Sequence, residues 1–136
     1  MKLLLDTNIL LLAAADMLPQ AAEEYVLDES NELYYSAASI WEIVIKRALD
    51  RPDFDADPHL MQTALLESGY FQLAIDARHT LLTGTLPMIH KDPFDRILLA
   101  QSLSEGVSLL TTDEILTKYP APVILVPHPP LFVKEV

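Results

Sequence analysis

The chain has 136 residues, enough to bury a core as one domain, and 51% of them are apolar, which favours a folded globule over a disordered chain. It contains no cysteine, which excludes disulfides, thiolate metal sites and cysteine nucleophiles and agrees with a reducing cytoplasm. The net charge of -11 opposes general binding to nucleic acid, so any contact with a phosphate backbone has to be local or assisted by a metal ion.

The leucine-rich beginning of the chain resembles a secretory signal only superficially. Asp6 and Asn8 interrupt its apolar part, and Lys2 is its only basic residue. The longest uninterrupted apolar run, residues 9–15, is far shorter than the roughly 18 residues of a membrane-spanning helix. We therefore expect a soluble, cytoplasmic protein with no membrane segment.

Short runs of β-type residues alternate with helical patterns along the chain. Strands are predicted at residues 2–5, 33–36, 71–75, 107–111 and 123–126. Helices are predicted at residues 9–17, 19–28, 39–50, 58–68, 77–83 and 93–105, with a short one at 114–119. This alternation predicts an α/β fold with a mostly parallel sheet, in a single domain over residues 1–136.

The only three glycines, Gly69, Gly84 and Gly106, each follow a helical pattern. They are predicted to end these helices in the left-handed conformation. This leaves no glycine-rich loop for binding phosphate.

Two acids directly follow predicted strands, at the edge where sites form in parallel sheets. Asp6 follows the first strand, and taken alone it is more simply an N-cap of the next helix. Asp113 closely follows the strand at 107–111, and a capping role there is an equal alternative.

Glu42 lies on the helix predicted at 39–50, on a polar stripe with Ser39, Lys46 and Asp50. Its simplest role is an i,i+4 ion pair with Lys46, which contributes only about 0.3 to 0.5 kcal/mol. The rest of the helix is expected to face apolar surroundings, through Ile40, Trp41, Ile43, Val44 and Ile45.

The stretch HKDPFDRILLAQSL contains two further acids. Asp92 before Pro93 is a strong helix start, with the aspartate as N-cap and the proline at the first helical position. Asp95 would then add a second carboxylate to the first turn, where it could favour the helix dipole. Because Asp92 already supplies the cap, we favour a functional role for Asp95.

If Asp6, Glu42, Asp95 and Asp113 converge, their mutual repulsion raises their pKa values unless cations lie between them. A site of oxygen ligands selects hard cations, Mg²⁺ or Mn²⁺, over zinc. Such ions activate water for attack on a phosphoryl group.

Four motifs, LLLDTNIL, SAASIWEI, HKDPFDRILLAQSL and LLTTDE, resemble PIN-domain ribonucleases in order and spacing, specifically toxins of the VapC type. The resemblance implies a Rossmann-like three-layer α/β/α sandwich with an acidic, Mg²⁺- or Mn²⁺-dependent site that cleaves RNA. It also implies a homodimer inhibited by a small antitoxin protein.

The resemblance assigns roles residue by residue. The acidic quartet consists of Asp6, Glu42, Asp95 and Asp113. Asp6 and Asp95 are expected as metal ligands; Glu42 is expected to bind metal or orient the attacking water, and Asp113 to support a second metal or a water-bridged shell. Supporting roles fall to Thr7 and Asn8, which would hold the first carboxylate, to Asp92 as a cap, and to Arg96 in positioning or phosphate contact.

Other side chains near the motifs have simpler interpretations. His90, beside a proline turn, is more often hydrogen-bonded or exposed than catalytic, and His59, His79 and His128 show no ligand spacing. Core or dimer packing is favoured over base stacking for Tyr34, Tyr35 and Trp41. A basic rim for RNA is predicted from Lys46, Arg47, Arg51, Lys91 and Arg96.

Two other functions compete with a nuclease. An aspartate-based phosphoryl-transfer domain also has an acid after its first strand, but this chain has Asn8 where such phosphatases need a second acid, and Pro127 and His128 follow the last strand where receiver domains need a lysine. The second alternative is a non-catalytic acidic binding module whose carboxylates are caps and surface charges.

Overall fold

The computed structural model describes residues 1–49 and 56–129, and in this part five parallel strands form one sheet in the order β3-β2-β1-β4-β5. The strands are β1 (Lys2–Leu5), β2 (Glu32–Ser36), β3 (Phe71–Leu73), β4 (Ser108–Thr111) and β5 (Val123–Leu125). The helices are α1 (Thr7–Ala14), α2 (Gln20–Leu27), α3 (Ala37–Ala48), α4 (Pro58–Glu67), α5 (Ala77–Thr83), α6 (Pro93–Glu105) and the short 3₁₀ helix η1 (Glu114–Lys118). The predicted sequence of strands and helices is confirmed.

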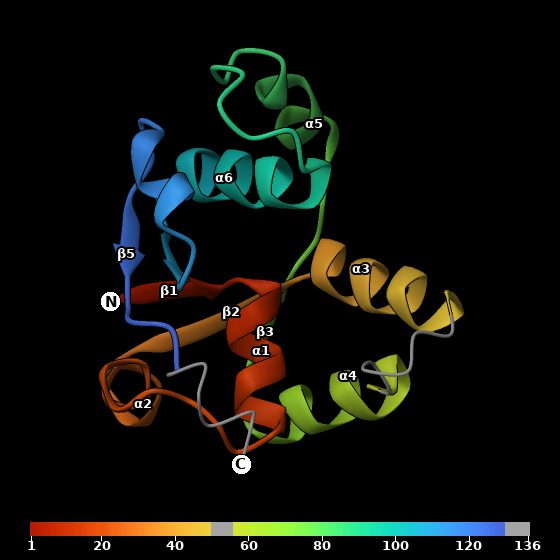
Figure 1. Ribbon diagram of the computed structural model, residues 1–136, viewed down its shortest axis with the longest axis vertical. Coiled ribbons are helices and arrows are strands. Elements are labelled where there is room, and N and C mark those ends of the chain that lie inside the picture. Colours follow the sequence, from red (N-terminus) through yellow and green to blue (C-terminus); the bar gives the residue numbers. More distant parts are fainter. Residues whose placement is uncertain (50–55, 130–136) are drawn as a thin grey trace.

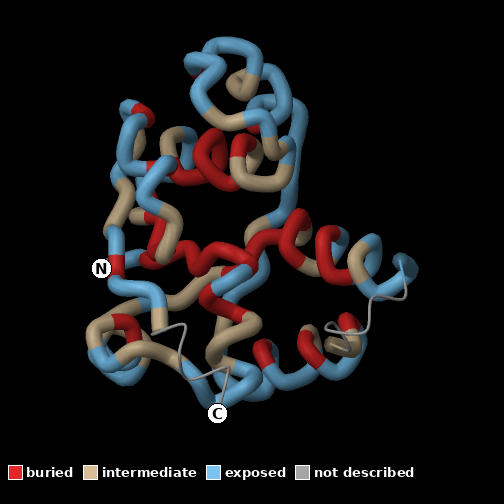
Figure 2. Tube along the Cα trace, in the orientation of Figure 1, coloured by how far each residue is buried: buried red, intermediate tan, exposed pale blue. Residues whose placement is uncertain are grey.

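Helices cover both faces of the sheet, as Figure 1 shows, with α5 and α6 on one side and α1, α2 and α4 on the other. Side chains alternate between the two faces along each strand. Leu3 and Leu5 pack with α1, α2 and α4, whereas Leu4 packs with α6. The buried segments in Figure 2 accordingly run along the strands and the inner sides of the helices. The predicted three-layer sandwich is confirmed.

Polar side chains at the strand ends set where the helices begin. Asp6 caps α1 through the Ile9 amide, and the Ser36 hydroxyl caps α3 through the Ala38 amide, so both helices begin two residues earlier than predicted. Asp57 likewise caps α4. The predicted end of the helix at residue 50 lies outside the described residues.

The orientation of α3 differs from the prediction. Its buried residues are Ala38, Ser39, Glu42 and Ile43. Trp41, by contrast, is 61% exposed, and Val44 and Ile45 are also exposed, so the expectation that these three side chains face apolar surroundings was wrong. The reason is that the polar stripe turns inward, where the Thr7 hydroxyl donates to Ser39. Trp41 meets the Phe94 ring edge-on at 5.2 Å instead of entering the core.

The aromatic predictions for β2 are met more closely. Tyr35 is fully buried in the core, and Tyr34 lies beside Phe71 with ring centroids 5.4 Å apart. None of the helices in the described ranges is long and apolar enough to cross a membrane.

Two of the three glycines adopt the predicted left-handed conformation, Gly69 with φ 86° and Gly106 with φ 68°. Gly84 does not, since it ends α5 with φ -68°. The prediction was therefore wrong for Gly84, where the chain leaves the helix without changing hand.

Gly106→Ala should lower the free energy of unfolding by about 1 kcal/mol, because an alanine at positive φ is strained even though open space surrounds the position. Urea unfolding measures the change. Gly84→Ala is the matched control: its φ suits alanine and its nearest contact, the Leu81 carbonyl at 3.4 Å, is ordinary, so its stability should be unchanged or higher. Equal losses in the two variants would contradict the conformational explanation.

Candidate metal centre

Asp6 is fixed at the end of β1 by bonds to the neighbouring strand and to its own helix. Its amide donates to the Leu110 carbonyl at 3.1 Å, and its Oδ1 accepts from the Ile9 amide at 2.9 Å. The Thr111 hydroxyl, at the end of β4, donates to Oδ2. The side chain is almost fully buried. Asp6 is thus both a helix cap and a member of the site.

Glu42 reaches the same region from α3. It is buried, and its carboxylate forms an ion pair with Lys46 at 2.9 Å. The predicted i,i+4 pair therefore exists, but it lies at the edge of a pocket and not on an open helix face. The ion pair and a role at the site do not exclude each other.

The first turn of α6 brings Asp92 and Asp95 to the pocket. Asp92 caps the helix by accepting from the Phe94 amide at 2.9 Å, as predicted. Asp95, one turn into the helix, has its Oδ2 2.9 Å from Nε2 of His90. The second carboxylate of this turn is therefore turned toward other titratable groups.

Asp113 follows β4 and divides its two oxygens. Oδ1 accepts from the Ile115 amide at 3.0 Å and so caps η1, while Oδ2 lies 3.7 Å from His90 Nε2. The Asp113 amide donates to the Thr111 hydroxyl oxygen, which links it to the residue that bonds Asp6. Thr111 thus connects the first and last acids of the quartet.

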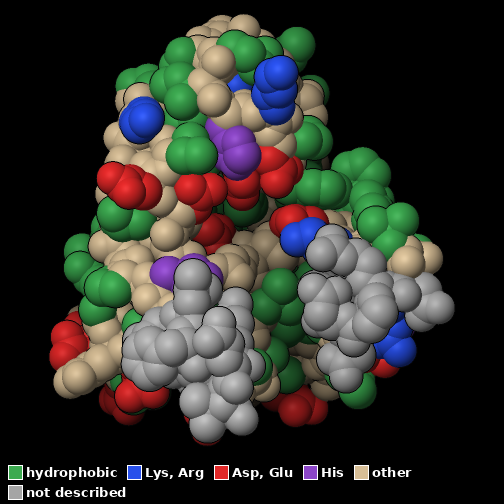
Figure 3. Space-filling model, viewed as in Figure 1, with side chains coloured by type: hydrophobic (Ala, Val, Ile, Leu, Met, Phe, Trp, Pro, Cys, Tyr) green, Lys and Arg blue, Asp and Glu red, His purple; other side chains and the backbone are tan. Residues whose placement is uncertain are grey.

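All four acids line one pocket of about 440 Å³. The described lining consists of Asp6, Thr7, Asn8, Leu11, Glu42, Lys46, Asp92, Asp95, Thr112, Asp113 and His128. Figure 3 shows acidic side chains gathered beside a histidine on the face in view. The convergence expected from the sequence is present in the structure.

Two of the crowded carboxylates, Asp6 and Asp95, have raised pKa values. Burial, with repulsion from Asp113 and Glu42, raises the pKa of Asp6 to about 6 despite the hydrogen bonds from Thr111 and Ile9. Burial, then repulsion from Asp92, Asp6 and Glu42, raises the pKa of Asp95 to about 7, against a lowering by His90. The pocket therefore disfavours its own negative charge, and a cation would relieve this.

The donor set fits a divalent cation. Carboxylate oxygens from Asp6, Glu42, Asp95 and Asp113 are the ligands that Mg²⁺ and Mn²⁺ prefer. The ligand atoms with metal spacing in the described part of the chain belong to Asp95, Asp113 and His90, all within 4.8 Å of one another. The resemblance gave Asp6 and Asp95 as the firmest ligands, whereas the group with metal spacing among the described residues joins Asp95 to Asp113 and His90 and does not include Asp6.

Thr7 and Asn8 were expected to hold the Asp6 carboxylate. They line the pocket, but their side chains bond to other residues. The Thr7 hydroxyl donates to Ser39 at 2.9 Å, and the Asn8 amide donates to the Thr112 hydroxyl at 2.9 Å. They tie α1 to α3 and to the end of β4. The bonds to the Asp6 carboxylate come from Thr111 and the Ile9 amide instead.

Arg96 points into the protein beneath the segment before α6. Its guanidinium donates to the carbonyls of Thr83, Leu86 and Pro87, and at 3.4 Å to the Tyr119 hydroxyl. Since these partners occupy its donors, Arg96 is suited to positioning and not to phosphate contact.

The predicted basic rim is smaller than expected. Lys46 lines the acid pocket, but Arg47 pairs with Asp57 at 3.4 Å, and Arg51 lies outside the described residues. Lys91 lies instead at a second hollow.

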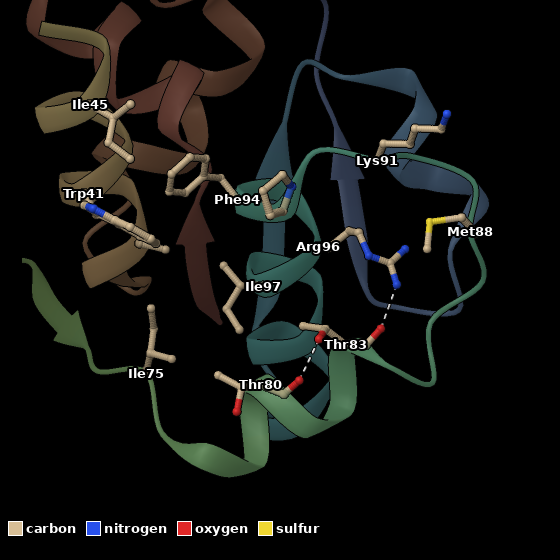
Figure 4. Close-up of a pocket in the computed structure, with 12 residues that line it drawn as sticks. Trp41, Ile45, Ile75, Thr80, Thr83, Met88, Lys91, Phe94, Arg96 and Ile97 are labelled. Atoms are coloured by element: carbon tan, nitrogen blue, oxygen red, sulfur yellow. Dashed lines mark hydrogen bonds between the residues drawn. The ribbon is translucent and has the colours of Figure 1, made fainter. Parts of the chain in front are cut away.

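This second hollow is an apolar groove of about 950 Å³ between α3, α5 and α6. Figure 4 shows Trp41 and Ile45 from α3 facing Phe94 and Ile97 from α6, with Met88 and Lys91 on the segment before that helix. None of the described residues that line it is acidic. The described lining of the groove therefore offers no carboxylate ligand for a hard cation, and the candidate metal centre is the smaller acidic pocket.

A family model described as PIN domain matches residues 3–122. The chain belongs to the PIN-domain family. PIN domains are generally nucleases, and the resemblance predicted from the four motifs is confirmed. Among curated proteins, none matches this PIN domain in sequence.

Solved structures of similar fold include VapBC complexes. That of VapBC2 from Rickettsia felis bound to a promoter DNA fragment is 17% identical with a TM-score of 0.69, over 94% of this chain and 99% of that chain. DNA-bound VapBC from Salmonella typhimurium is 17% identical with a TM-score of 0.66, over 91% and 97%. VapBC-5 from Mycobacterium tuberculosis, a member of a family of toxin-antitoxin systems, is 16% identical with a TM-score of 0.54, over 93% and 98%. At these identities the similarity shows a shared PIN fold.

Three participants in the site were missed or set aside in the sequence. Thr111 stands in the motif LLTTDE, where the hydroxyl residues before the acid were a usable signal. His90 opens the motif HKDPFDR, five residues before Asp95. His128 reaches the pocket from beyond β5, and no local pattern marks it.

Asp95→Asn should stabilise the metal-free PIN domain at neutral pH. Folding raises the pKa of the Asp95 carboxyl from 3.8 to about 7, so its contribution to stability is complete below about pH 4 and is lost as the pH rises through about 7. The variant avoids this loss, and its stability relative to wild type should rise by on the order of 1 to 3 kcal/mol between about pH 4 and pH 8. Urea unfolding in chelator measures this.

Asp57→Asn is the matched control, because the pKa of Asp57 is lowered by the α4 amides that it caps. Its stability relative to wild type should stay nearly constant between about pH 4 and pH 8, because a lowered pKa places the change in protonation below about pH 4. A pH-independent difference for Asp95→Asn would contradict the raised pKa.

Proposed function

We propose that this PIN domain, residues 1–136, is a Mg²⁺- or Mn²⁺-dependent endoribonuclease and the toxin of a toxin-antitoxin pair. The observation that carries the proposal is the convergence of Asp6, Glu42, Asp95 and Asp113 on one pocket. The raised pKa values of Asp6 and Asp95 add support. Helix capping alone does not require carboxylates to lie so close together that their ionisation becomes unfavourable.

In this proposal Asp6, Asp95 and Asp113 hold the cation, and Glu42 binds it or orients the attacking water. A bound divalent cation supplies Lewis-acid stabilisation of charge that develops on the phosphate, and it makes water more acidic. Lys46 forms an ion pair with Glu42 at 2.9 Å. Among the described residues that line the pocket, Lys46 is the only lysine or arginine. Thr111 and the Ile9 amide keep the Asp6 carboxylate in one orientation.

A phosphodiester substrate suits this charge arrangement once the cation is present. The chain carries -11 overall, so RNA is not attracted by the general field of the protein. The bound cation and Lys46 would provide the local positive charge at which a phosphate can lie.

Purified protein should cleave total RNA when Mg²⁺ or Mn²⁺ is added and should be inactive in chelator. Asp6→Asn and Asp95→Asn should each lower the cleavage rate by about 100-fold or more, because each removes a charge that holds the cation. Cleavage is mapped at the RNA ends, and metal binding is measured by calorimetry on the same samples.

Asp57→Asn is the matched control, an identical substitution at a helix cap away from the pocket, and it should retain activity. Metal-independent cleavage, or full activity in Asp95→Asn, would overturn the proposal. Hydrolysis of a phosphomonoester without RNA cleavage would favour the aspartate-based phosphoryl-transfer alternative. Absence of metal binding in folded wild-type protein would favour the binding module.

A small antitoxin, a homodimer and a cytoplasmic location complete the proposal. They are supported by the motif resemblance and by the similarity in fold to VapBC structures, one of which is described as a toxin-antitoxin system. The exposed apolar side chains along the groove, among them Trp41 and Met88, agree with a protein partner. Light scattering on the purified chain gives its oligomeric state directly.

A further inference from the structure

We propose that His90 is itself a ligand of the cation in the acid pocket, through Nε2, and that it makes the pocket favour Mn²⁺ and Co²⁺ over Mg²⁺. The inference rests on the proposed function, because it concerns the same cation. It goes further by adding a nitrogen donor to a site otherwise composed of carboxylates.

The spacing of the three ligand atoms carries the argument. His90 Nε2 lies 2.9 Å from Asp95 Oδ2 and 3.7 Å from Asp113 Oδ2. Neighbouring ligands of an octahedral ion, each about 2.1 Å from the metal, lie roughly 3 Å apart, and opposite ligands lie roughly 4.2 Å apart. The observed separations fall in this range, and all three atoms lie within 4.8 Å of one another. One ion can therefore contact all three side chains after only small side-chain movements.

The backbone of His90 is held by a buried tyrosine. The His90 amide donates to the Tyr119 hydroxyl at 2.7 Å, and Tyr119 is buried against the core on the α6 side of the sheet. Arg96 donates to the same hydroxyl and to the carbonyls of Thr83, Leu86 and Pro87. These contacts fix the segment that carries the imidazole, as a metal ligand requires.

A plain hydrogen bond from His90 to Asp95 is the competing explanation. In that case the imidazole would serve one carboxylate, with Nε2–H donating to Asp95. Nε2 instead lies near the oxygens of two carboxylates from different elements, α6 and the end of β4. Asp95 and Asp113 supply the negative charge that draws a cation, and the imidazole supplies the donor that discriminates between cations.

Metal preference follows from the chemistry of the donor. Mg²⁺ prefers oxygen ligands and keeps much of its water, whereas affinity for imidazole nitrogen increases from Mn²⁺ to Co²⁺ and beyond. A nitrogen at one position therefore adds more to the binding of Mn²⁺ or Co²⁺ than to that of Mg²⁺. Removing it should lower the Mn²⁺ preference without removing the site.

The test measures Mn²⁺ binding to the full chain by electron paramagnetic resonance, in wild-type protein and in His90→Gln. Glutamine places an amide where Nε2 was, so it can still donate to Asp95 but supplies no imidazole nitrogen. The dissociation constant for Mn²⁺ should rise by about 10- to 100-fold, while that for Mg²⁺ stays near the wild-type value. Pulsed measurements should show an imidazole ¹⁴N coupling to Mn²⁺ in wild-type protein that is absent from the variant.

His59→Gln is the matched control, because His59 is exposed in the first turn of α4 and does not belong to the group of ligand atoms formed by His90, Asp95 and Asp113. It should keep the wild-type affinities and the ¹⁴N coupling. Thermal unfolding of both variants checks that the fold is intact. If His90→Gln fails to fold, the ¹⁴N coupling is measured in wild-type protein and in His128→Gln, because His128 also lines the pocket; a coupling that persists in His128→Gln assigns the ligand nitrogen to His90, and one that disappears there overturns the role of His90.

Mn²⁺ bound to wild-type protein without an imidazole ¹⁴N coupling would overturn the role of His90 and leave the proposed function standing. Equal losses of Mn²⁺ and Mg²⁺ affinity in His90→Gln would likewise reduce His90 to an orienting hydrogen-bond donor. Failure of Mn²⁺ to bind wild-type protein, or equal binding to Asp95→Asn, would overturn the proposed function as well.

Discussion

Repulsion among carboxylates collected at one edge of a parallel sheet is the constraint on which the rest of this structure depends. Burial and neighbouring charge raise the pKa of Asp6 to about 6 and that of Asp95 to about 7. The Thr111 hydroxyl and the Ile9 amide donate to Asp6, and Lys46 pairs with Glu42. The pKa values of Asp6 and Asp95 are raised in spite of these contacts. The sheet and its helices thus hold the acids in an arrangement that a divalent cation would complete.

Helix capping occupies only one of the two carboxylate oxygens of Asp6 and of Asp113. In Asp113, Oδ1 accepts from the η1 amide while Oδ2 faces His90. In Asp6, Oδ1 caps α1 and Oδ2 accepts from Thr111. A carboxylate has two oxygens and a cap needs only one. A capping role and a place in the acid pocket therefore do not exclude each other, since Asp6 and Asp113 cap their helices and also line the pocket.

The parts of the fold that could be predicted are those with local causes. Asp92 and Pro93 fix the start of α6, and three consecutive leucines mark β1 as a strand of a sheet covered on both faces. The gathering of the acids followed from one general rule, that the carboxyl ends of parallel strands share an edge. The extent of the elements was less secure, because Ser36 and Asp6 extend their helices by capping.

Features that depend on contacts between distant segments could not be predicted. The rotation of α3 exposes Trp41 because Ser39 meets Thr7, 32 residues away in the chain, and helical periodicity alone could not reveal which stripe would be buried. Arg96 turned inward, where its guanidinium donates to the carbonyls of Thr83 and Pro87, 13 and 9 residues away in the chain. His90 gained its place by the same route, through Tyr119, 29 residues later. The acids that supply charge were therefore visible in the sequence, and Thr111 and His90 stood inside the motifs, whereas the contacts of the hydroxyl and the imidazole with those acids became visible only through packing.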